Sequence, residues 1–176
     1  LAEVKGISMR KALEISGAVA GKRDLRQAML FLQQYGITQN LGMKIYNFYQ
    51  GRLYQVIREN PYKLADDIDG VGFRIADEIA SKAGILPDSD FRIRSGILYV
   101  LEQATGQGHT CLPMDQLMQE ARRLLGVEID SMNDRIMDLI MDKKIVVKTK
   151  EDIQMVYSSV SYYTELTIAQ MLKDLN

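Results

Sequence analysis

Three glycines in the first half of the chain open segments of one pattern. "GISMRKALEI" begins at Gly6, "GITQNLGMKI" at Gly36 and "GVGFRIADEI" at Gly70. In each, an aliphatic residue follows the glycine, then Ser, Thr or Gly, and later a small residue with isoleucine three positions beyond it. The segments start 30 and 34 residues apart, a spacing typical of a helical repeat unit.

The residue types predict a helix, a tight hairpin and a second helix in each segment. A leading glycine can adopt positive φ and reverse the chain after a helix. The third position holds residue types that cap a new helix, and the small residue and the isoleucine share its inner face. The caps are Ser8, Thr38 and Gly72, and the inward residues are Ile7, Ala12, Ile15, Ile37, Gly42, Ile45, Val71, Ala76 and Ile79.

Such hairpins have an affinity for anions. The first backbone N–H groups of the second helix have no partners within the helix, and the helix dipole adds positive potential there. Phosphate of a nucleic-acid backbone is the ligand we expect, held without reading the bases. The predicted DNA-binding residues are Gly6, Ile7, Ser8, Arg10, Lys11, Gly36, Ile37, Thr38, Asn40, Lys44, Gly70, Val71, Gly72, Phe73 and Arg74.

Other residues bear on this prediction. The second segment lacks a second glycine and offers Gln39 and Asn40 instead. The acidic residues at 66, 67 and 69 oppose phosphate binding beside Gly70, although we interpret them as a solvated turn and not as a metal site. Phe73, Tyr46 and Tyr49 have the chemistry of base-stacking platforms, but their helical spacing favours the core.

Composition narrows the class of protein. The 176 residues carry a net charge of −1, so the chain is not a strongly basic DNA-coating domain. Residues 1–86 hold 12 basic and 9 acidic side chains, against 10 and 14 in residues 87–176. A single cysteine excludes an internal disulfide framework and favours the cytoplasm, and no signal peptide or membrane-spanning run is present. Because the chain begins at Leu1 and not at a methionine, we expect a fragment of a longer protein. We also expect a monomer.

Catalytic motifs are missing from the sequence. "GAVAGKR" at 17–23 has one residue too few between its glycines for a phosphate-binding loop, and Arg23 stands where Ser or Thr would hold magnesium. The chain has one histidine, His109, and one cysteine, Cys111, too few for a zinc site or for histidine-based catalysis. We therefore predict no catalytic residue, no metal site and no bound cofactor in this segment.

The second half has a different pattern. Apolar periodicity predicts helices around 90–105, 114–125 and 130–144, the last capped by Ser131. "IVVK" and "IQMVY" predict a β-hairpin about "TKED". Three helices and a β-hairpin resemble a winged helix. The third helix carries four aspartates, which would repel DNA, so we favour a scaffolding or protein-contact role. An amphipathic helix is expected from 162 to the end.

The hairpin pattern resembles the helix-hairpin-helix motif of sequence-independent DNA-binding proteins. "YGITQNLGMKIYNFYQ", "VIRENPYKLADDIDGVGFRIADEIA" and "IRSGILYVLEQATGQGHTCLP" are similar to the amino-terminal accessory region of RecD/TraA-type helicases. The resemblance implies a region that binds single-stranded or junction DNA in repair or recombination. It also implies a separate motor that uses ATP and Mg²⁺ to unwind duplex DNA in the 5′ to 3′ direction. Other replication or repair proteins are further implied partners.

We therefore predict a mainly α fold, in which a tandem helix-hairpin-helix array precedes a winged-helix-like helical domain with one small β-hairpin. The expected divisions are 1–86 for the DNA-binding hairpins, 87–160 for the winged-helix-like domain and 161–176 for a helix that leads to the motor. Two other interpretations stay open. One is a protein-interaction module with purely architectural hairpins, and the other is the non-catalytic part of a repair nuclease.

Overall fold

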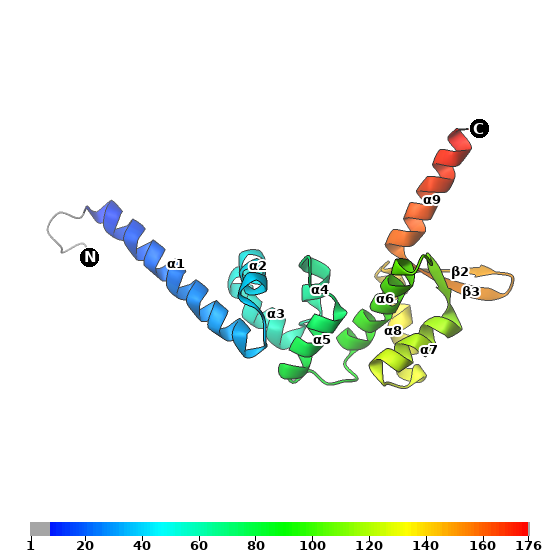
Figure 1. The fold of residues 1–176 in the computed structure, drawn as a ribbon, viewed down its shortest axis with the longest axis horizontal. Helices are drawn as coiled ribbons and strands as arrows, with labels where there is room; N and C mark the ends of the chain where they lie inside the picture. The colour runs from blue at the N-terminus through cyan, green and yellow to red at the C-terminus, as the bar shows by residue number, and fades with distance from the viewer. Residues whose placement is uncertain (1–7, 176) are drawn as a thin grey trace.

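The computed structural model describes residues 8–175 and is elongated, with α1 at one end and α9 and a β-hairpin at the other (Figure 1). It is mainly α-helical, as predicted. The elements are α1 (Met9–Gln34), α2 (Gln39–Tyr49), the 3-10 helix η1 (Gln50–Arg52), α3 (Leu53–Glu59), α4 (Lys63–Asp67), α5 (Phe73–Lys82), α6 (Asp90–Gly106), β1 (Cys111–Pro113), α7 (Met114–Leu125), α8 (Ile129–Met141), β2 (Ile145–Lys150), β3 (Ile153–Ser158) and α9 (Ser159–Asp174).

The turn between α1 and α2 is fixed by Gly36. Its φ of 78° lets its amide reach the Gln33 carbonyl at 3.0 Å and the Ile37 amide reach the Leu32 carbonyl at 3.3 Å. These two bonds satisfy the last carbonyls of α1 and stop the helix. Ile37 is buried and pins the turn, and Thr38 is the N-cap residue of α2, so the local chemistry predicted from the sequence is confirmed.

The turn between α4 and α5 also depends on a glycine, but this glycine lies at a different place in the turn. The Val71 amide donates to the Ile68 carbonyl at 3.0 Å, and Gly70, with φ 93°, occupies the third position of that four-residue turn. A β-turn of this kind requires positive φ there, which glycine adopts without strain. Gly72 is the N-cap residue of α5, as predicted.

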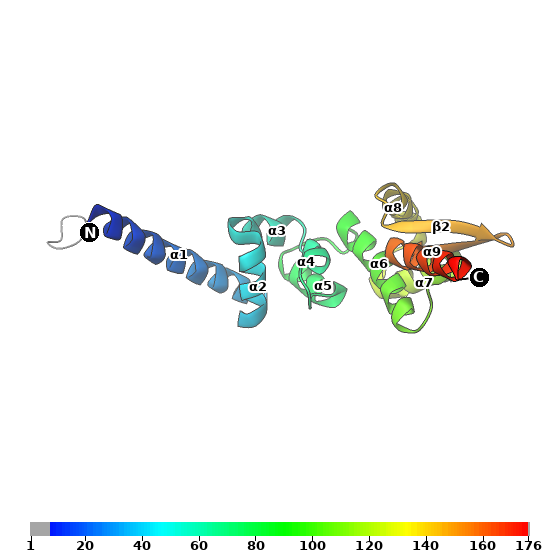
Figure 2. The ribbon, with the colours of Figure 1, turned by 90° about the horizontal axis from the view of Figure 1, so that it is seen from above.

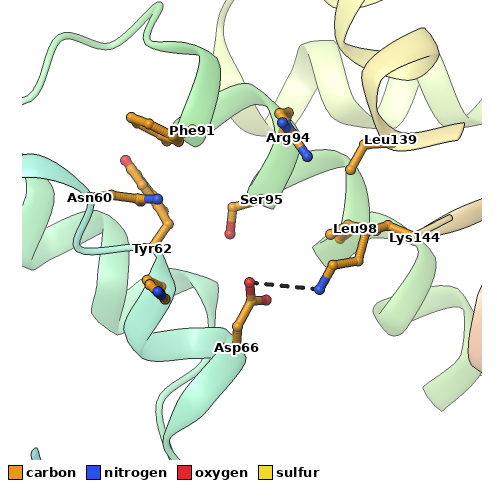
Figure 3. Close-up of a pocket in the computed structure, with 10 residues that line it drawn as sticks. Asn60, Tyr62, Asp66, Phe91, Arg94, Ser95, Leu98, Leu139 and Lys144 are labelled. Atoms are coloured by element: carbon orange, nitrogen blue, oxygen red, sulfur yellow. Dashed lines mark ion pairs between the residues drawn. The ribbon is translucent and has the colours of Figure 1, made fainter. Parts of the chain in front are cut away.

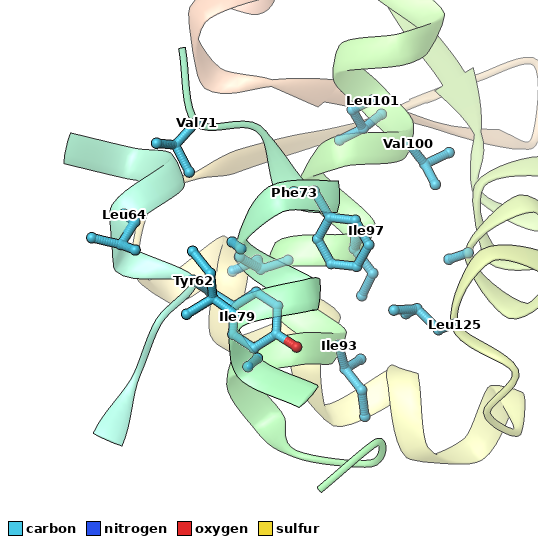
Figure 4. Close-up of a cluster of buried hydrophobic side chains, with 14 of the residues drawn as sticks. Tyr62, Leu64, Val71, Phe73, Ile79, Ile93, Ile97, Val100, Leu101 and Leu125 are labelled. Carbon is cyan, nitrogen blue, oxygen red and sulfur yellow. The ribbon is translucent and has the colours of Figure 1, made fainter. Parts of the chain in front are cut away.

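One hydrophobic core runs from the end of α1 to the sheet. Figure 4 shows the part of it that lies around Phe73 and Ile97. The ring of Phe73 lies between those of Tyr62 and Tyr99, with centroids 5.9 and 5.3 Å apart. Ile79 on α5 and Ile97 on α6 are both buried in the same core. The elements up to α5 and the elements from α6 onward thus share one core across the linker 83–89. The domain boundary expected at residue 86 falls within this linker.

Polar contacts reinforce this packing. Asp77 on α5 accepts hydrogen bonds from Tyr62 Oη at 2.6 Å and from Arg92 Nε at 2.8 Å. Arg92 also donates to the carbonyls of Pro87 at 2.9 Å and Leu125 at 2.8 Å, so one guanidinium joins α5, the linker and the end of α7. Arg92 is mostly buried, which makes these bonds costly to lose.

A cavity of about 160 Å³ lies between α4, α6 and α8 (Figure 3). The ammonium of Lys144, just after α8, lies 3.9 Å from a carboxylate oxygen of Asp66 on α4 and closes one side of it. The pair ties the acidic turn of the hairpin part to the carboxy-terminal part.

The carboxy-terminal part contains α6, α7 and α8 followed by the expected hairpin of β2 and β3. The sheet has a third strand, β1, in the order β1-β3-β2 with both pairs antiparallel. The prediction of a hairpin alone was therefore incomplete. α8 begins at Ile129 with Glu128 as its N-cap residue, so the cap predicted at Ser131 was wrong by three positions.

Two helix segments extend beyond the core. α1 contacts the rest of the molecule through its carboxy-terminal half, where Ala28 and Leu32 are buried. Ile15, predicted to face inward, is 36% exposed, because the described residues place no helix against that face. α9 has no fully buried residue along its described length, and its contacts with the sheet are with β2 and β3. Most of the apolar residues that were expected to form its inner face are exposed. Within residues 8–175, no helix is long and apolar enough to cross a membrane.

Candidate nucleic-acid interface

The hairpin at Gly36 presents an exposed helix N-terminus. The first intrahelical bond of α2 joins the Gly42 amide to the Thr38 carbonyl at 2.8 Å, so the amides of residues 39–41 have no partner within the helix. Thr38, Gln39 and Asn40 are exposed, and the Thr38 side chain makes no capping hydrogen bond. These amides are available to an anion.

The hairpin at Gly70 presents a second N-terminus of the same kind. Its first intrahelical bond runs from the Ala76 amide to the Gly72 carbonyl at 3.2 Å, which leaves the amides of residues 73–75 without helical partners. Gly72 has no side chain to cap them, and Arg74 is exposed beside them. This hairpin therefore combines free donors with a cation.

The fold brings these two hairpins together around one cleft of about 410 Å³. Residues of both turns and both second helices form its walls. The lining residues are Tyr35, Gly36, Ile37, Thr38, Asn40, Leu41, Lys44, Asp69, Gly70, Ile75, Glu78 and Ile79. Most of the residues predicted for the second and third segments thus lie at or beside a single site.

Two lysines connect the hairpins reciprocally. Lys44 on α2 donates through Nζ to the carbonyl of Asp69, the residue before Gly70, at 3.3 Å. Lys82 on α5 donates to the carbonyl of Tyr35, the residue before Gly36, at 3.2 Å. Each ammonium therefore lies against the turn of the other hairpin, and both lysines are exposed. Each turn therefore has a positive charge beside it that comes from a lysine of the other hairpin and not from its own residues.

Lys82 was missed in the sequence analysis. It lies twelve positions after Gly70, outside the repeated segment, and its partner is 47 residues away. Lys82 comes close to Gly36 only because α5 packs against the turn between α1 and α2. The sequence shows only that Lys82 lies in the last turn of a short helix. Lysine is common there because it interacts favourably with the helix dipole, so this position does not point to a binding site.

The acidic residues near Gly70 are partly engaged elsewhere. Tyr49 Oη donates to Asp67 Oδ2 at 2.6 Å, and Asp66 faces Lys144. Burial of Tyr49 and this hydrogen bond raise the pKa of its phenol well above the ordinary value. Asp69 and Glu78 remain exposed at the cleft and set a limit on its positive potential.

Several predicted residues can contribute through their backbone alone. The side chains of Ile37, Val71 and Phe73 are buried, so they position the turns and cannot reach a ligand. The ring of Phe73 is not a stacking platform, because both of its faces are covered. Tyr49 is buried as well, as its helical spacing favoured.

The first predicted hairpin is not part of this cleft. Gly6 and Ile7 lie outside the described residues. Ser8 caps α1 as predicted, accepting from the Lys11 amide at 3.3 Å. Arg10 and Lys11 are exposed at the amino-terminal end of the 26-residue α1, away from the other hairpins (Figure 1), and Arg10 pairs with Glu14 at 3.6 Å.

The structure bears on nucleotide and metal chemistry in this part of the chain. "GAVAGKR" lies inside α1 as regular helix, so this segment is not a loop that could surround a phosphate. Within the part of the chain that the structure describes, no three His, Cys, Asp or Glu side chains converge as a metal site.

Comparison with known protein families gives a match over the hairpin region. A family described as the ATP-dependent RecD2 DNA helicase HHH domain matches residues 21–111, where HHH denotes helix-hairpin-helix. The match covers both hairpins of the cleft, α6 and the start of β1, and does not include the segment at Gly6.

Proposed function

Since the chain belongs to the family of the ATP-dependent RecD2 DNA helicase HHH domain, we propose that its two adjoining hairpins bind the sugar-phosphate backbone of DNA without reading base sequence. The chain is an accessory, DNA-binding region of a RecD-like helicase. The proposal concerns which residues make the contact and what kind of contact it is.

The reciprocal lysine arrangement carries the proposal. Two helix N-termini with free amides face one cleft, and Lys44 and Lys82 flank it from opposite hairpins. Amide donors and ammonium groups recognise phosphate oxygens whatever the base. Arg74, exposed in the first turn of α5, adds a third cation. Binding of this kind depends strongly on salt, because each neutralised phosphate releases counterions.

The proposed role in the parent protein follows from the resemblance. The region would hold single-stranded or junction DNA for a motor that unwinds duplex in the 5′ to 3′ direction in cytoplasmic repair or recombination. The motor would use ATP and Mg²⁺, for which residues 8–175 offer no phosphate loop. We propose a monomer that works with other replication or repair proteins.

Fluorescence anisotropy tests this function. Labelled single-stranded, duplex and forked oligonucleotides of several sequences would be titrated with the 176-residue chain at a series of salt concentrations. The variants are Lys44→Gln and Arg74→Gln, with Lys173→Gln in the last turn of α9 as the matched control. Circular dichroism would establish that each variant is folded.

We expect salt-dependent binding that is similar for all sequences. Each of these two hairpin variants should weaken binding and reduce the salt slope by about 1, and the control should do neither. Undetectable binding at low salt would overturn the proposal in favour of architectural hairpins in a protein-interaction module. Unchanged slopes in both hairpin variants would show that the hairpins are not the DNA site.

A further inference from the structure

The outer face of the sheet is distinct from the hairpin cleft. Tyr157 on β3 lies opposite Cys111 and Val146, and Met155 lies opposite Lys148, so these residues share one face. The alternate residues, including Leu112 and Val156, are buried in the core. The first face therefore points away from the core.

A row of tyrosines borders this face. α9 begins directly after β3, and its first turns contact both β2 and β3, on the opposite side of β2 from α8 (Figure 2). The rings of Tyr157 and Tyr162 are 5.5 Å apart, and those of Tyr162 and Tyr163 are 5.4 Å apart, all nearly perpendicular. Tyr163 is 59% exposed and Tyr157 and Tyr162 are partly buried, so Tyr163 is the ring of this row most open to solvent.

Positive charge lies beside the tyrosines. The ammonium of Lys148 lies 5.4 Å from the ring centre of Tyr162, and Lys150 follows two residues later on the same face. Among residues 8–175, neither lysine has a carboxylate within ion-pair distance. Asp134 and Asp138 of α8, and Asp142 directly after it, pair with arginines. Glu165 on α9 places a negative charge near Tyr157. The outer face thus carries two exposed lysines that have no ion-pair partner among the described residues.

We propose that this outer face binds single-stranded DNA, with phosphates at Lys148 and Lys150 and bases stacked on Tyr163 and Tyr162. Exposed aromatic rings beside cations are how proteins hold single strands without sequence preference, since every base has a π face. Paired bases cannot stack on the tyrosines, so this face discriminates single strand from duplex. The inference rests on the proposed function in that DNA is the ligand, and it assigns the single strand to a second site.

Binding of labelled oligo-dT and of a blunt duplex tests the assignment. The variants are Tyr163→Ala and Lys148→Gln, and the matched control is Phe48→Ala, since Phe48 is a similarly exposed ring on α2. We expect Tyr163→Ala to weaken oligo-dT binding by about tenfold and to leave duplex binding unchanged. Lys148→Gln should weaken oligo-dT binding less, and the control should change neither.

A second measurement uses the absence of tryptophan from the sequence. Tyr163→Trp keeps a stacking ring and introduces a single emitter, whose fluorescence oligo-dT should quench at a concentration that matches the anisotropy curve. No quenching, or equal losses for oligo-dT and duplex in Tyr163→Ala, would overturn the assignment. Tyr163-dependent oligo-dT binding that Lys44→Gln and Arg74→Gln leave unchanged would instead refute the hairpin function and support this site.

Discussion

The ammonium of Lys82 lies over Gly36, donating to the Tyr35 carbonyl at 3.2 Å. A Cβ atom built on Gly36 would come within 2.5 Å of that nitrogen. The absence of a side chain at Gly36 therefore does two things: it allows the turn and it admits a cation from another helix. We predict that Lys82→Gln lowers the free energy of unfolding by about 1 kcal/mol at most, since the hydrogen bond is exposed.

The same variant should have a larger effect on DNA binding. Removal of one cation from the cleft is expected to lower the salt slope by about 1, as for Lys44. Chemical denaturation and anisotropy on one preparation would separate the two effects. A loss of stability without any loss of affinity would make Lys82 an architectural residue.

Gly36→Ala tests the turn itself. Alanine at φ 78° is strained by about 1–2 kcal/mol and also displaces Lys82. Gly51→Ala is the matched control, because Gly51 has no positive φ and no atom near its missing Cβ. Thermal unfolding should show a lower Tm for Gly36→Ala alone, and equal Tm values for both variants would contradict the account of the turn.

The sequence was most informative where structure is local. Positive φ at Gly36 and Gly70 and the caps at Thr38 and Gly72 were predictable because a few adjacent residues determine a turn. The reciprocal lysine contacts were not, because they depend on how two hairpins pack. The exposure of Ile15 was not predictable either, since a periodic pattern shows which face is apolar and not what covers it. β1 has three residues, too few for a periodic signal.

Arg92→Ala should be among the most destabilising single substitutions. It leaves Asp77 with only Tyr62 as a partner and removes donors from two carbonyls in the linker and at the end of α7. Loss of one partner from a largely buried ion pair costs about 3–5 kcal/mol. Urea unfolding measures this cost, and the exposed Arg123→Ala, which removes a surface pair with Glu120, is the control expected to cost under about 1 kcal/mol. Similar costs for both variants would mean that the Arg92 network is weaker than its geometry indicates.

The phenol groups of two buried tyrosines should lose their protons at a higher pH than free tyrosine does. Burial and the hydrogen bonds to Asp67 and Asp77 raise the pKa of Tyr49 and of Tyr62 above the ordinary value of 10.0. Since the folded state holds these protons more tightly than the unfolded state, their contribution to stability is complete below pH 10 and declines as the pH rises above it. Phenolate absorbance should show a late component that Tyr49→Phe reduces. A titration unchanged by that variant would contradict the assignment.

Substitutions in the turn between β2 and β3 should stabilise the protein. Glu151 and Asp152 both have positive φ, at 51° and 64°, in a two-residue loop between paired Lys150 and Ile153. Asn-Gly adopts this conformation with less strain. The double variant Glu151→Asn, Asp152→Gly should gain about 0.5–1 kcal/mol. Calorimetry would measure the gain, and a lower Tm would show that the turn has another conformation in solution.

The exposed half of α1 has a consequence for how the molecule opens. This half contains Gly17 and Gly21, each costing a helix about 1 kcal/mol relative to alanine, while its anchor, Ala28 and Leu32, lies at the other end. Amides near the glycines should exchange with deuterium through local fraying, and those beside Leu32 should exchange only through global unfolding. α1 is thus one continuous helix whose two halves differ in stability. Its amino-terminal half can unwind while the hairpin at Gly36 stays folded.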